Sequence, residues 1–268
     1  MIAAYGRVLK PALVVAAAGA ALGACRLPAT QRPEVAGPSI GSRPPVLTTL
    51  HVPLDRVARI SRFRSGVGHD YSDGVERCRS MKHYVAFRNA DGSAGEPGRP
   101  HDPPWTTVPV VAPLAGVVVA VQAEWAGDQV RIRSAVDPRV TVVLFHVRRA
   151  ASVDVGTALA AGQAVGRHAS DETMSDIAVE VADPAAPQGR RLVSVFDPAV
   201  MGDAAFAALA AWGVGARADL IIGRAERDAA PLWCDGERFV VGAGAAVGEM
   251  LGAGAMTGPA DWVALRGP

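Results

Sequence analysis

Between residues 108 and 182, apolar and polar side chains alternate with a period of two, and this pattern constrains the fold most strongly. The segment "VPVVAPLAGVVVAVQAEW" predicts two strands around a turn, while "DQVRIRS", "VTVVLFHV" and "SDIAVEVA" each predict one more. In Val130-Arg131-Ile132-Arg133 the alternation is strict, so this strand should have one solvent-facing side. Short strands separated by tight turns indicate a mainly β, mostly antiparallel domain.

The remaining segments divide the chain around this domain, which we place at residues 46–199. Residues 25–45 are rich in proline and predict an extended tether. Residues 89–105 are rich in proline and glycine and predict a long surface loop. Residues 200–268 form a C-terminal extension, with a helix expected around Asp203–Trp212 and a small, weakly patterned appendage from residue 214.

The first 24 residues have the features of an export signal. Arg7 and Lys10 precede an apolar stretch that is too short for a permanent membrane span. The stretch ends in "LGAC", which resembles a bacterial lipobox and implies acylation of Cys25. The alternative is an ordinary signal peptide with a chance cysteine. We expect a lipid-anchored envelope protein, on the periplasmic face of the outer membrane if the host has two membranes, because Arg26 is not the aspartate of an inner-membrane retention signal.

The cysteines and the charge add two further constraints. With Cys25 acylated, Cys78 and Cys234 remain, an even number in an oxidising compartment, which predicts a disulfide between them. A thiolate ligand or nucleophile at Cys78 is the alternative. The formal net charge is +1, so nothing in the overall charge indicates a nucleic-acid partner.

The segment "SGVGHDYSDGVERCRSMKHY", residues 65–84, concentrates side chains that could bind a metal ion. His69 and Asp73 are four residues apart, a spacing that can present an imidazole and a carboxylate to one ion. The alternative is a hydrogen-bonded pair inside a loop. Asp70 is more typical of a turn residue, and His83 could simply cap the strand that enters the sheet after this segment.

The order of these features resembles the LytM/lysostaphin-type zinc peptidoglycan endopeptidases. His-x-x-x-Asp is followed by "VAPLAG", "GDQVRI", an apolar strand ending in His, "AGQAVG" and a strand ending in "EV", over roughly residues 65–182. The resemblance implies an antiparallel β-sandwich of the duplicated hybrid motif type. It also implies zinc ligands at His69 and Asp73, and a catalytic role for His146 in orienting water or stabilising an oxyanion.

The chain departs from the family at the last motif. The family has His-x-His-Phe-Glu-Val there, whereas this chain has "SDIAVEV", which places Asp176 at the first histidine and Ala178 at the ligand histidine. Ala178 cannot bind a metal. Asp176 lies two residues away on the same strand face, so it is the best replacement ligand and completes a candidate zinc set of His69, Asp73 and Asp176. His83 and His168 are further substitutes within reach.

Other residues have less specific interpretations. "AGQAVG" also resembles biotinyl and lipoyl carrier domains, but no hairpin after Val108 contains the lysine that such attachment needs, since the chain has only Lys10 and Lys82. Trp125 could stack on a ligand or cover the core. We expect the pair Arg190-Arg191 to be solvated.

Three functions are compatible with the sequence. The first is an envelope lipoprotein with a degenerate LytM-like domain that binds peptidoglycan or a cell-wall protein. The second is an active or altered zinc metallopeptidase that cleaves peptidoglycan cross-links. The third is a purely structural lipoprotein.

Overall fold

The computed structural model describes residues 44–240 and 259–267. The predicted signal segment, the lipidation site Cys25 and the tether up to residue 43 lie outside the described residues, so they remain predictions. No helix among the described residues is long and apolar enough to cross a membrane.

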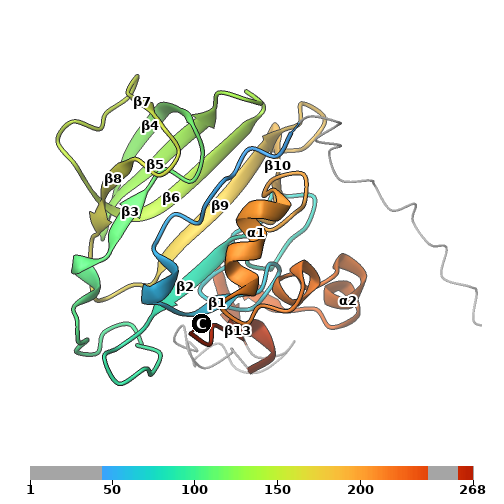
Figure 1. Cartoon of the computed structure of the whole chain (residues 1–268). Coiled ribbons are helices and arrows are strands. Elements are labelled where there is room, and N and C mark those ends of the chain that lie inside the picture. The colour runs from blue at the N-terminus through green and yellow to red at the C-terminus, as the bar shows by residue number, and fades with distance from the viewer. Residues whose placement is uncertain (1–43, 241–258, 268) are drawn as a thin grey trace, which may run out of the picture. The chain divides into compact units, whose positions relative to one another are not determined.

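Within the described residues, an eleven-stranded sheet dominates the fold, and every strand pairing in it is antiparallel (Figure 1). Its main strand order is β13-β1-β2-β9-β6-β5-β4-β7, while β10 pairs with β9 and β8 pairs with both β3 and β6. The strands are β1 (Val57–Ser61), β2 (His83–Phe87), β3 (Pro109–Val111), β4 (Gly116–Glu124), β5 (Gly127–Ser134), β6 (Val140–Arg149), β7 (Ala158–Leu159), β8 (Ala164–His168), β9 (Ser175–Ala182), β10 (Arg190–Val193) and β13 (Trp262–Ala264).

The helical part is small, and both of its α-helices follow β10 in the chain. The α-helices are α1 (Asp203–Ala210) and α2 (Arg224–Ala229), and the 3-10 turns are η1 (Leu54–Arg56), η2 (Trp105–Thr107), η3 (Arg217–Leu220) and η4 (Pro259–Asp261). Helix α1 covers most of the expected helix around Asp203–Trp212. The predicted class, mainly antiparallel β with a small helical extension, is confirmed.

The burial of the strands follows their sequence pattern. Along β5, Val130 and Ile132 are buried while Arg133 is exposed, as the strict alternation predicted. The inner face of β9 contributes Ile177, Val179 and Val181 to the main hydrophobic core. A second, smaller cluster lies on the opposite face of β9 and comprises Phe63, Met81, Val143, Phe145, Ala178 and Leu192.

The C-terminal extension is more integrated than a small appendage. Strand β13 pairs with β1, joining residues 262–264 to the edge of the main sheet. A separate two-stranded hairpin of β11 (Trp233–Asp235) and β12 (Arg238–Val240) is linked to the first motif by the disulfide Cys78–Cys234. This disulfide was predicted from the cysteine count and is confirmed. The thiolate alternative for Cys78 is therefore excluded.

Strand β6 has a bulge at the point where it changes its pairing partner. Residues 140–144 of β6 pair with β9, and residues 147–149 pair with β8. Between these two stretches, Phe145 and His146 lie opposite the single residue Gln129 of β5, where the register shifts. Strand β6 thus changes partner at His146, and bulges of this kind redirect side chains at the edges of sheets and near functional sites.

Candidate functional site

An open pocket of about 1020 Å³ lies at the point where β6 changes partner. Seven parts of the chain line it: the segment 68–71, the start of β2, Pro97, the β4–β5 hairpin, the bulge of β6, the loop 172–174 and the turn of the β11–β12 hairpin. The disulfide at Cys234 and a backbone hydrogen bond from the Asp70 N–H to the Glu237 carbonyl (2.7 Å) fix the last of these beside the first. The pocket is therefore assembled from segments that are distant in the sequence.

His146 reaches the pocket because of the β6 bulge. Its backbone has a φ of 56°, in the left-handed region that side chains other than glycine and asparagine rarely adopt. Both Phe145 and His146 consequently line the pocket, although a regular strand would direct them to opposite faces. His146 is largely buried, and it lines the pocket. Its catalytic role stays a prediction.

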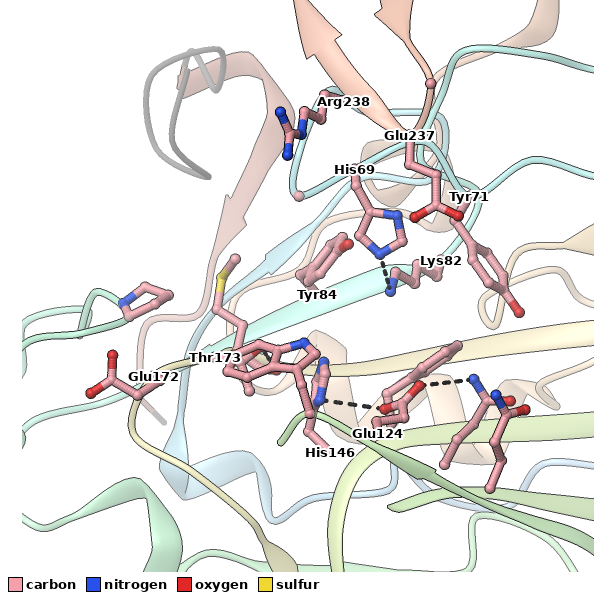
Figure 2. A pocket seen from close by; sticks show the side chains of 18 of the residues that line it. His69, Tyr71, Lys82, Tyr84, Glu124, His146, Glu172, Thr173, Glu237 and Arg238 are labelled. Carbon is pink, nitrogen blue, oxygen red and sulfur yellow. Dashed lines mark hydrogen bonds and ion pairs between the residues drawn. The ribbon is translucent and has the colours of Figure 1, made fainter. Parts of the chain in front are cut away.

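Two carboxylates flank the His146 ring. Nδ1 lies 3.4 Å from the Glu124 carboxylate (Figure 2). On the other side of the ring, Nε2 lies 3.5 Å from the Asp176 carboxylate. Trp125 follows Glu124 in the hairpin turn, and its ring centroid lies 5.7 Å from that of His146. Trp125 is 74% exposed and lines the pocket, so it does not cover the core and its ring is free to contact a ligand.

Lys82 is a buried residue of the pocket wall, and it was not among the site residues predicted from the sequence. Its side chain forms an ion pair with Asp176, and its Nζ lies 3.2 Å from Nε2 of His69. Figure 2 shows His69 and Lys82 pointing toward each other, between Tyr71 and Tyr84. Burial by itself lowers the pKa of Lys82, but the Asp176 carboxylate and the Tyr84 hydroxyl raise it more, so the amine stays protonated.

The protonation of His69 follows from its two contacts. Nδ1 lies 2.9 Å from the Asp70 carbonyl, which can only accept, so Nδ1 carries the proton. Nε2 therefore carries a lone pair, which accepts a hydrogen bond from the Lys82 ammonium. Burial and the neighbouring Lys82 charge lower the pKa of His69, which favours this neutral form.

Asp73 does not lie in the pocket. Its buried carboxylate accepts hydrogen bonds from Nε of Arg191 (2.7 Å), from the Leu192 N–H (3.2 Å) and from the N–H groups of Val75 and Glu76 (both 3.0 Å). Leu192 pairs with Glu180, four residues along β9 from Asp176, or about 13 Å at the usual rise of a strand. Arg191 is buried here, so the expectation of a solvated Arg190-Arg191 pair is wrong for Arg191.

The alternative ligands are also engaged elsewhere. His83 lies between the Ser61 carbonyl (2.7 Å) and the Ser194 hydroxyl (2.9 Å), and His168 donates to the Thr173 carbonyl (2.8 Å). Burial lowers the pKa of each of these histidines to about 4. Asp70 accepts a hydrogen bond from the Arg79 N–H (3.0 Å), which fits the turn role expected of it.

The donor set therefore does not fit a zinc ion held by His69, Asp73 and Asp176. The structure brings His69 and Asp176 to the same ammonium and places Asp73 in a separate ion pair with Arg191. Among the residues that the structure describes, no group of three His, Cys, Asp or Glu side chains is arranged to hold a metal ion.

No protein-family model matches the chain, and no curated protein matches it. Among solved structures, a chain described as a glycyl-glycine endopeptidase LytM from Ruminococcus gnavus aligns at 16% identity and a TM-score of 0.29, over 41% of this chain and 42% of its own. Lysostaphin aligns at 16% identity and a TM-score of 0.27, over 46% and 49%. The SpoIIQ-SpoIIIAH pore-forming complex aligns at 13% identity and a TM-score of 0.35, over 55% and 87%.

Solved structures of the family that the sequence resembles are thus among the structural neighbours of this chain. The alignments with LytM and lysostaphin span less than two-thirds of those chains, and all three TM-scores are below 0.5.

Proposed function

We propose that this chain is a lipid-anchored envelope protein whose pocket binds peptidoglycan, or a protein of the cell wall, without cleaving it. The observation that carries the proposal is the open pocket of about 1020 Å³ with Trp125 exposed on its rim. A pocket of this volume can enclose a ligand of several hundred daltons, and an exposed aromatic ring beside it offers a stacking surface for a sugar or a peptide bond.

The chemistry of the pocket favours binding over hydrolysis. A zinc hydrolase needs a coordinated ion with an open position for water, and two of the three expected ligands are instead bound to Lys82. His146 could still move a proton, because its ring lies between Glu124 and Asp176. These contacts position the ring, but they supply no activated nucleophile.

Sedimentation with isolated cell-wall sacculi tests the proposal. The purified chain, carrying Cys25→Ser so that it remains free of lipid, should sediment with sacculi equally well with and without a chelator. No soluble muropeptides should appear. Release of muropeptides that the chelator abolishes would support the metallopeptidase instead, and failure to sediment would exclude peptidoglycan as the ligand.

The lipid anchor is tested separately in cells. The natural chain should fractionate with membranes and take up labelled fatty acid, whereas Cys25→Ser should do neither. Fatty-acid labelling that survives in Cys25→Ser would contradict an anchor at this cysteine.

A further inference from the structure

Lys82 is a buried cation whose presence needs a physical reason. Only 2% of its surface is exposed, and Nζ lies over the rings of Phe145 (4.2 Å), Tyr84 (4.8 Å) and Tyr71 (5.1 Å). Burying an ammonium costs free energy unless a carboxylate and hydrogen-bond acceptors compensate it. Asp176 and His69 provide that compensation. Together they form a buried site that accommodates one positive charge.

The choice of lysine at this position is distinctive in this chain. Lys82 is the only lysine among the described residues, and arginine serves as the basic residue elsewhere in them. An ammonium is a compact point charge, whereas a guanidinium is a planar fork that needs more room. The positively charged group at this site is therefore close in size to a single metal ion.

The sheet register explains how Lys82 reaches this point. Strand β2 pairs His83 with Ile177 and Tyr84 with Asp176, so continuing the antiparallel register by one residue places Lys82 opposite Ala178. Ala178 has a small side chain packed in the cluster with Met81 and Phe145. Because no large side chain extends from position 178, the Lys82 side chain can reach both Asp176 and His69.

We propose that the Lys82 ammonium substitutes for a divalent metal ion, and that removing its side chain opens a transition-metal site at His69 and Asp176. The Nε2 lone pair of His69 and the Asp176 carboxylate are the kinds of donor that Zn²⁺ and Co²⁺ prefer, and both are directed at Nζ. Nε2 of His146, 3.5 Å from the Asp176 carboxylate, is the nearest further donor. The inference concerns the cation alone and does not depend on which ligand the pocket binds.

Cobalt uptake by variants of the full chain tests this inference. Lys82→Ala should bind one equivalent of Co²⁺, seen as visible absorption, at least tenfold more tightly than the natural chain. Lys82→Met is the matched control, because it removes the charge but keeps most of the volume, and it should bind no better than the natural chain. The double variant His69→Ala/Lys82→Ala should lose the binding. A folded Lys82→Ala variant that binds Co²⁺ no better than Lys82→Met overturns the proposal.

Two further measurements keep the proposal testable if Lys82→Ala is unstable. Zn²⁺ should raise the thermal unfolding midpoint of Lys82→Ala but not that of the double variant, and equal effects on both overturn the proposal. In the natural chain, the nitrogen resonances of His69 should show a proton on Nδ1 and should not change when Zn²⁺ is added. A zinc-dependent shift of the Nε2 resonance would mean that a metal displaces the ammonium, which also overturns the proposal.

Discussion

Asp73 accepts a hydrogen bond from Nε of Arg191 at 2.7 Å, and this buried ion pair keeps its carboxylate away from His69, only four residues earlier in the chain. The pair also ties the first motif to β10. The spacing of His69 and Asp73 predicted that they bind one metal ion together. In the structure the two side chains have different partners, Lys82 and Arg191.

Removing Arg191 should destabilise the domain strongly. Arg191→Met leaves the Asp73 carboxylate buried without its cation, which typically costs about 3–5 kcal/mol of unfolding free energy. Urea unfolding of the two proteins measures the difference. Arg190→Met is the matched control, because Arg190 is about one-third exposed and its partner Glu180 also pairs with Arg131, so its loss should cost about 1 kcal/mol or less. Equal costs for the two variants would contradict the role given to Asp73.

Reducing the disulfide should loosen both the fold and the pocket. Cys78 and Cys234 close a loop with a sequence separation of 156, which corresponds to about 4–5 kcal/mol of stabilisation on the chain-entropy model. The variant Cys78→Ser/Cys234→Ser should unfold at correspondingly lower urea and should bind sacculi more weakly, because the β11–β12 turn forms part of the pocket wall.

Thiol counting provides the direct check of this bond. In a Cys25→Ser background, the denatured chain should react with no alkylating agent before reduction and with two equivalents after it. Two reactive thiols before reduction would show that the bond does not form.

Trp125→Ala should reduce ligand binding without affecting stability. The side chain is 74% exposed, so its loss removes little core packing, whereas loss of a stacking ring typically costs about 1–3 kcal/mol of binding. Sedimentation with sacculi over a range of protein concentrations measures this change. Trp233→Ala is the control, since Trp233 is 46% exposed and does not line the pocket. If both variants bind like the natural chain, Trp125 is not part of the binding surface.

Stability should fall as the pH decreases from about 6.5 toward about 4. Burial lowers the pKa of His51 to about 3 and those of His83 and His168 to about 4, from an ordinary value of 6.5. In this range the unfolded chain binds protons that the folded chain does not, so the free energy of unfolding rises with pH. Each such proton contributes a slope of about 1.4 kcal/mol per pH unit.

Urea unfolding at about pH 7, 6 and 5 checks this dependence. His83→Gln cannot titrate and should show a shallower dependence, even though losing the contacts to Ser61 and Ser194 lowers its stability at every pH. A stability that is flat over this range would contradict the burial of these rings.

Much of the architecture was predictable because it follows from local periodicity. The alternation along β4 and β5 and the apolar runs of β6 and β9 mark strands without reference to distant residues, and in β5 the alternation also marks the buried face. Strands β1 and β13 were not predicted, because each is short and its pairing with the other is fixed only when the two ends of the domain meet.

For the site, the sequence by itself determined the candidates: His69, Asp73, His146 and Asp176 as functional residues, Ala178 as the missing ligand, and the pairing of Cys78 with Cys234. Only the tertiary structure decided how these residues combine. It directs Asp73 to Arg191, turns His146 into the pocket through a bulge, and brings Lys82 to His69 and Asp176 across β2 and β9. The physical reason is that residue spacing limits which side chains can meet within a segment, whereas the partner of a buried charge is chosen by strand pairing between distant segments.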